Sequence, residues 1–126
     1  MTNDKRGPRI HRMTLFKIPD ETNQKRLLDA YHVVAEEQKK LASQKNGKPY
    51  ILQLTAGKTM EDQKARGYTV ASYIEFASMD DMRYYDNECL AHAMLKEIGP
   101  SLNLSEPPTI LCFEKSNLAA AQDSKP

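Results

Sequence analysis

The run GYTVASYIEFASMDDMRYYDNECLAH, at residues 67–92, constrains the fold more than any other part of the sequence. Its first half alternates at period two, which predicts a strand over residues 68–76 with Val70, Ile74 and Phe76 on one side. Ser78 followed by Asp81 is the pattern of a helix N-terminus, so the strand turns directly into a helix. The remainder of the chain is expected to supply the elements that close a hydrophobic core around this unit.

Five further segments carry secondary-structure patterns. Residues 10–18, 50–55 and 109–114 are rich in β-branched and apolar residues and predict strands. Residues 22–44 repeat apolar side chains at helical spacing, and a second helical pattern resumes after Asp86-Asn87 and ends at Gly99-Pro100. This order predicts an α+β fold, a ferredoxin-like four-stranded antiparallel sheet with helices on one face. We expect a disordered lead over residues 1–9, one domain over 10–115 and a disordered tail over 116–126.

Two of the predicted strands are apolar on both sides, although helices would cover only one face of the sheet. In the third strand, Ala71 and Tyr73 lie opposite Val70 and Ile74. A large exposed apolar face normally marks a partner surface, and the simplest partner is a second copy packed sheet against sheet. The sequence therefore predicts a homodimer through the sheet face.

The charge balance and the hydrophobic pattern exclude several classes of protein. The chain has 18 basic and 17 acidic residues, a formal charge of +1, so neither nucleic acid nor a membrane surface is an expected partner. No apolar run reaches the roughly 18 residues of a membrane span, and the charged start has no secretory signal. Cys89 and Cys112 are interpreted as buried, reduced thiols. These features favour a cytoplasmic protein.

Metal and phosphate sites are not indicated by the motifs. The three histidines fall on three different predicted elements without metal-ligand spacing, and no cofactor is expected. Residues 55–59, TAGKT, resemble the end of a phosphate-binding loop, but Leu52 stands where that loop requires a glycine. We interpret this similarity as coincidence.

A small polar set remains within apolar surroundings. If the His11 side of the first strand faces the helices, one pocket holds His11, Tyr85 and His92. Imidazole exchanges protons near neutral pH, and a tyrosine hydroxyl polarises a carbonyl oxygen. Such a pocket favours aldol-type cyclisation, dehydration or enolisation without a cofactor. The alternative is structural, because a histidine on an apolar face and tyrosines at helical spacing are usually packing residues. The residues expected to bind the substrate are Met13, Leu15, Tyr31, Val70, Ser72, Met82 and Cys89.

Four motifs in matching order resemble those of the stress-responsive A/B barrel (Dabb) family. They are HRMTLFK at 11–17, GYT at 67–69, EFASMDD at 75–81 and LAH at 90–92, and the resemblance covers about residues 10–115. It implies a homodimeric α+β barrel. Similarity to olivetolic acid cyclase-like members implies a cofactor-independent cyclase or lyase acting on a polyketide-like or phenolic substrate. In that case His92 is the general base or acid, Tyr85 orients the carbonyl and His11 assists.

The chain also departs from the family pattern. Val70 stands where the family has a histidine, and Cys89-Leu90 stands where it has His-Pro. The interval from Tyr85 to His92 is one residue longer than in the cyclase. Other family members are stress-response proteins without a firm activity, so a non-enzymatic stress or scaffold protein, or a ligand carrier, is the alternative. A connected cavity that reaches His92 favours the small-molecule function, and a filled interior favours the alternative.

Overall fold

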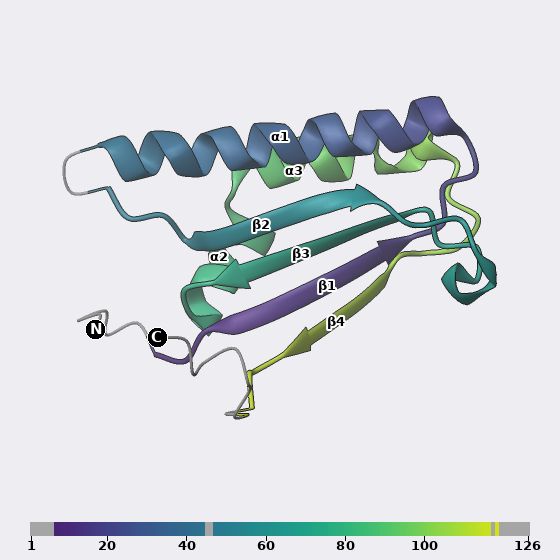
Figure 1. Cartoon of the computed structure of the whole chain (residues 1–126). Coiled ribbons are helices and arrows are strands. Elements are labelled where there is room, and N and C mark those ends of the chain that lie inside the picture. Colours follow the sequence, from purple (N-terminus) through teal and green to yellow (C-terminus); the bar gives the residue numbers. More distant parts are fainter. Residues whose placement is uncertain (1–6, 45–46, 117, 119–126) are drawn as a thin grey trace, which may run out of the picture.

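The computed structural model describes residues 7–44, 47–116 and 118, so most of the expected lead and tail lies outside the described residues. Figure 1 shows the strands and helices of the chain. In chain order they are β1 (Ile10–Phe16), α1 (Glu21–Ser43), β2 (Ile51–Lys58), η1 (Gln63–Ala65), β3 (Val70–Phe76), α2 (Met79–Asn87), α3 (Leu90–Ile98), η2 (Gly99–Leu102) and β4 (Thr109–Phe113). The 55–58 part of the phosphate-loop-like sequence lies in β2, within a strand.

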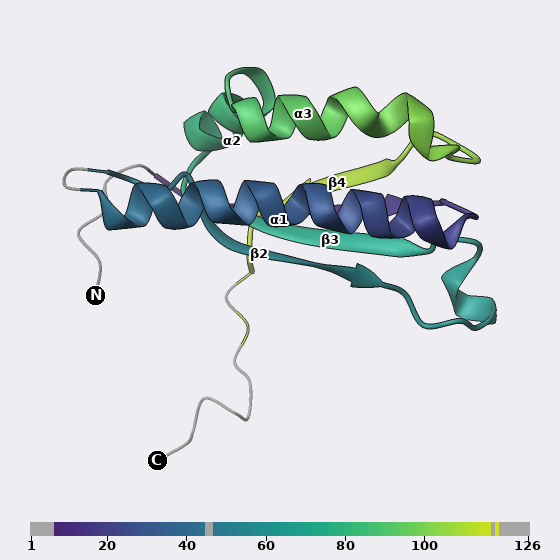
Figure 2. The same cartoon turned by 90° about the horizontal axis from the view of Figure 1, so that it is seen from above.

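The strands form one four-stranded antiparallel sheet in the order β2-β3-β1-β4. The long helix α1 and the shorter α3 run side by side, and both lie on the same face of the sheet (Figures 1 and 2). This arrangement confirms the predicted ferredoxin-like α+β fold. No helix of the described residues lies over the other face of the sheet.

The register of β1 and β3 decides which side chains face the helices. Thr14 pairs with Ser72, and both are buried, while Arg12 bonds to Asp86 of α2. Because side chains alternate along a strand, His11 and its neighbours two and four residues on point to the open face. The assumption that the His11 side faces the helices is therefore wrong. If the facing of a strand is assigned one residue out of step, every side chain of that strand is placed on the opposite face of the sheet.

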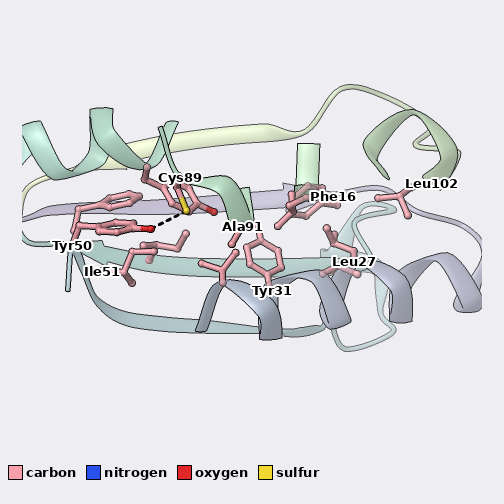
Figure 3. Packing of buried hydrophobic residues seen from close by; sticks show 14 of the residues in the cluster. Phe16, Leu27, Tyr31, Tyr50, Ile51, Cys89, Ala91 and Leu102 are labelled. Carbon is pink, nitrogen blue, oxygen red and sulfur yellow. Dashed lines mark hydrogen bonds between the residues drawn. The ribbon is translucent and has the colours of Figure 1, made fainter. Parts of the chain in front are cut away.

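The hydrophobic core lies between the sheet and the helices. Figure 3 shows Phe16, Tyr31 and Leu27 converging from β1 and α1, with Leu102 closing one end. Fully burying a large apolar side chain contributes about 1.5–3 kcal/mol, so these positions dominate stability. The core residues of β3 are the predicted Val70, Ile74 and Phe76, each 2% exposed or less.

Local signals at the end of β3 also match the structure. Ser78 caps α2, because its hydroxyl accepts from the Asp81 backbone N–H at 3.1 Å and donates to the Asp81 carboxylate at 2.8 Å. Both cysteines are free thiols, and Cys89 is buried as expected. Cys112 is exposed on the edge strand β4, which corrects the expectation for that residue. Within the described part of the chain, every helix is too short or too polar to cross a membrane.

Candidate functional site

A cleft of about 990 Å³ lies between the helix-facing side of the sheet, α3 and the segment that leads into β4. Most of its lining is apolar, and the polar groups are few. The apolar lining includes Phe16, Leu27, Ile74, Leu95, Leu102, Leu104 and Ile110. The polar lining includes Arg12, Thr14, Tyr31, Tyr85, Asp86, His92 and Lys96. A cavity of this size and composition suits a largely apolar small molecule with a few oxygen-bearing groups.

Tyr85 and His92 form the closest aromatic pair in the cleft. Their rings are parallel to within 5°, with centroids 3.8 Å apart, and Phe76 packs on Tyr85 from the sheet at 5.3 Å. Tyr85 is 2% exposed, so its ring is fixed by packing on both sides. The structure therefore brings two of the three predicted catalytic side chains into one cavity.

The hydrogen bond of His92 fixes its tautomer. Its Nδ1 lies 3.0 Å from the backbone carbonyl oxygen of Tyr85, and that oxygen can only accept. Nδ1 therefore carries the proton in the neutral ring, and Nε2 is left with a free lone pair. Burial lowers the pKa of His92 below its ordinary value, so the ring is neutral at physiological pH. A neutral imidazole in this state can act as a base.

The two tyrosines of the cleft differ in what their hydroxyls bind. The Tyr31 hydroxyl and the Ser72 hydroxyl are 2.9 Å apart in the buried core. The Tyr85 hydroxyl has no hydrogen-bond partner among the described residues. Burial also raises the pKa of Tyr85, which keeps it protonated and able to donate. Its hydroxyl is thus a free donor beside a neutral histidine.

An ion pair that the sequence reading missed lies beside these groups. Arg12 of β1 donates to both carboxylate oxygens of Asp86 at 2.8 Å, and Asp86 follows Tyr85 directly in α2. Lys96 of α3 donates to the backbone carbonyl of Asp86 at 2.8 Å. The only sequence signal for this pair was the polar Asp86-Asn87 interruption of an otherwise helical pattern. Within the described residues, no group of three or more His, Cys, Asp or Glu is placed to hold a metal ion.

His11 does not share this cleft. It lies on the open face of the sheet, where its Nδ1 is 2.6 Å from the Tyr73 hydroxyl and its ring stacks on Phe113. Met13 and Leu15 follow it on that face, as the register with Tyr73 and Ala71 requires. The expected three-residue pocket is therefore corrected to a Tyr85–His92 pair.

The other expected substrate-binding residues divide between the lining and the core. Tyr31 lines the cleft, and Ser72 lies behind it as its hydrogen-bond partner. Val70 is fully buried in the core, and Cys89 is buried against the Tyr50 hydroxyl, which donates to its sulfur at 2.9 Å (Figure 3). Met82 packs against the core and accepts a long contact from Cys112 at 3.9 Å.

One curated relative is 41% identical over 90 residues, a fusaristatin A biosynthesis cluster protein of Gibberella zeae. The alignment covers 71% of this chain and 62% of the relative, so the chain spans less than two thirds of that protein's length. Its name places it with a biosynthesis cluster and gives no reaction.

Solved structures share the fold at low sequence identity. A dimeric ferredoxin-like protein from Jannaschia sp. CCS1 superimposes with a TM-score of 0.68 at 13% identity, covering 85% of this chain and 99% of its own. A monooxygenase from Streptomyces coelicolor, solved in complex with nanaomycin D, has a TM-score of 0.64 at 22% identity and covers 94% and 96%. Such identities show a common fold and leave the activity open.

The sequence pattern that defines the stress-responsive A/B barrel domain matches residues 10–117, which is nearly the whole described chain. Both the motifs and the observed sheet agree with this match. The chain therefore belongs to the stress-responsive A/B barrel domain family.

Proposed function

We propose that this chain is a cofactor-independent cyclase or lyase that acts on a polyketide-like or phenolic molecule in the cytoplasm. The observation that carries the proposal is the cleft of about 990 Å³, into which both the Tyr85 and His92 side chains project. A filled interior would have favoured the scaffold alternative. The biosynthesis cluster relative supports a small-molecule substrate. Membership of the A/B barrel family supports a barrel fold that holds this substrate.

The geometry favours proton transfer next to a carbonyl group. Nε2 of His92 takes a proton from a carbon that lies between two carbonyls, and the electron pair of that C–H bond moves into an enolate. The Tyr85 hydroxyl donates to the oxygen on which negative charge develops. The enolate carbon then attacks a second carbonyl of the same chain, and the resulting alkoxide takes the proton back from His92. Loss of water from this product, followed by enolisation of the remaining ring ketones, yields the aromatic ring.

The sheet face supports a homodimer as the working form. Several of its apolar side chains are exposed: Met13 is 39% exposed, Leu111 is 58% exposed and Phe113 is 46% exposed. Pairing of Met13 with both Tyr73 and Leu111 makes these side chains one continuous surface across three strands. The Jannaschia protein of the same fold is dimeric. Sheet-to-sheet pairing would bury this surface and close the α+β barrel.

The decisive experiment compares the products formed from a linear tetra-β-ketide thioester by the unaltered protein and by two variants. We expect His92→Ala and Tyr85→Phe each to lower the yield of cyclised product at least tenfold, since each removes one chemical group. An unchanged product profile in both variants would contradict the proposal.

Binding without conversion would support the carrier alternative instead. In that case the ligand raises the melting temperature of the protein, because it binds only the native state. If neither conversion nor a shift of melting temperature occurs with polyketide-like and phenolic ligands, the scaffold alternative stands.

A further inference from the structure

Asp86 has the Arg12 guanidinium on one side and the imidazole of His92 on the other. One carboxylate oxygen, Oδ1, accepts from Arg12 at 2.8 Å and lies 3.9 Å from Nδ1 of His92. That second distance is too long for a hydrogen bond in the neutral state. It is short enough for strong attraction once the ring carries a positive charge. Asp86 is therefore the carboxylate that a protonated His92 would face.

Each partner of the ion pair is held in place from a different element. The Arg12 side chain is 12% exposed, and its guanidinium also lies over the Phe76 ring at 5.3 Å. Its planar fork fits the carboxylate with two parallel hydrogen bonds, which fixes the orientation of Asp86. Lys96 ties the Asp86 backbone to α3, the helix that carries His92. The carboxylate thus has little freedom to move away from the imidazole.

The charges that act on His92 come from all three surrounding elements. Arg12 on β1 and Lys96 on α3 are cations that oppose its protonation, while Asp86 on α2 is the anion that favours it. Tyr85, also on α2, contributes its backbone carbonyl. The hydrogen bonds from Arg12 lower the pKa of Asp86, so the carboxylate stays ionised over the whole working pH range.

We propose that Asp86 is the positioning residue of His92, and that it stabilises the imidazolium formed when Nε2 takes a proton. Arg12 orients this carboxylate and offsets part of its negative charge, which adds a small effect to the burial that keeps the resting histidine neutral. The inference rests on the proposed function only in giving His92 a proton to accept. It adds a residue pair that neither the motifs nor the comparisons assign.

The test is an NMR titration of the imidazole carbon-bound protons in the full chain, with His92→Gln used to assign the His92 signal. It compares Arg12→Met with the double variant Arg12→Met/Asp86→Asn. Neither variant leaves a buried, unpaired guanidinium. The Asp86 carboxylate that Arg12→Met leaves unpaired is 34% exposed and can be solvated, so both variants are expected to fold. Removing the Asp86 charge in this background should lower the titration midpoint of His92 by roughly half a pH unit or more.

A second comparison tests the part assigned to Arg12. Arg12→Met alone should raise the His92 midpoint above that of the unaltered protein, because the full charge of Asp86 then acts on the ring. Asp80→Asn is the matched control, since Asp80 lies on the same helix in an exposed pair with Arg83. It should leave the midpoint unchanged. A purely structural ion pair would alter melting temperature in these variants without moving the His92 titration in opposite directions.

Equal His92 midpoints in Arg12→Met and in the double variant would overturn the inference. This result does not depend on any substrate, so it is separable from the proposed activity. If the midpoints differ as expected but no cyclisation occurs, the proposed function fails and the positioning role of Asp86 stands.

Discussion

Replacing Tyr85 with phenylalanine separates the chemistry of the site from its stability. The substitution removes one hydroxyl and keeps the ring that stacks on His92 at 3.8 Å. Tyr31→Phe is the matched control, because both tyrosines line the cleft and both are buried, at 2% and 5% exposure. The difference is that the Tyr31 hydroxyl is bonded to Ser72 at 2.9 Å.

The expected magnitudes follow from these contacts. An intramolecular hydrogen bond contributes a net of about 0.5–1.5 kcal/mol, and leaving its buried partner unsatisfied costs about 1–3 kcal/mol. Tyr31→Phe leaves the buried Ser72 hydroxyl without this hydrogen-bond partner, so we expect a loss of about 2 kcal/mol in the free energy of unfolding. Tyr85→Phe breaks no bond among the described residues, so we expect a change within about 0.5 kcal/mol of zero.

Activity should follow the opposite order. Loss of a donor to the developing oxyanion lowers kcat by about 100- to 1000-fold, so Tyr85→Phe is expected to be stable and nearly inactive. Tyr31→Phe should keep most of its activity while it unfolds at lower urea concentration.

Urea unfolding followed by circular dichroism measures the stability, at one protein concentration because dimerisation contributes to it. If Tyr85→Phe lowers the free energy of unfolding by more than about 1 kcal/mol, the Tyr85 hydroxyl is a structural group and its assigned catalytic role is wrong.

Three further predictions concern stability and assembly. Because Arg12 lowers the pKa of Asp86 below its ordinary 3.8, the pair stabilises the fold fully above that pH, and this contribution is lost as pH falls through the lowered value. Thermal melts should therefore show a steeper loss of stability below about pH 4 than Arg12→Met/Asp86→Asn does. Ser78→Ala removes the cap of α2 and should cost about 1 kcal/mol in urea unfolding, and no change would mean that the cap is compensated. Leu111→Glu should shift light scattering toward the 14.3 kDa monomer, whereas Leu90→Glu, outside the sheet face, should not. A dimer that survives Leu111→Glu would place the interface elsewhere.

The elements with strong periodicity were predictable from the sequence. Val70, Ile74 and Phe76 recur at the period of a strand, and Asp81 follows Ser78 at the spacing of a capping box, so local interactions decide both elements. The face of β1 was not predictable in this way. Burial of a cation is costly in isolation, and the compensating Asp86 lies 74 residues away in the sequence. The sequence pattern of β1 contains no information about that partner.

The sequence predicted a pocket at Tyr85 and His92 but not its far wall, which includes the segment between α3 and β4. Leu104 and Ile110 line the cavity from parts of the chain without helical spacing, and no residue pattern predicts their distance from the sheet. Residue chemistry and motif resemblance nevertheless both selected Tyr85 and His92. Both depend on which side chains occur in order along the chain, whereas the shape of a cavity depends on how distant segments pack.

The interruption between α2 and α3 is what brings these two side chains together. In an unbroken helix, residues seven apart are separated by about 10.5 Å along the axis. The Tyr85 and His92 rings are 3.8 Å apart, so the chain must turn between them. Glu88 and Cys89 make that turn, since both backbone N–H groups donate to the carbonyl of Tyr84 and close α2.

Cys89 then begins α3 by accepting from the backbone N–H of Ala93, and its sulfur is anchored by Tyr50. The polar stretch that weakens the helical pattern in the sequence is thus a requirement of the site. The double variant Glu88→Ala/Cys89→Ala removes the sulfur that Tyr50 binds and places two strong helix formers at the turn. It therefore favours a continuous helix, in which Tyr85 and His92 are two turns apart. It should separate the two rings and abolish the Tyr85–His92 contact, which the ring-current shift of the His92 protons would report. Retention of that shift would show that packing alone holds the pair.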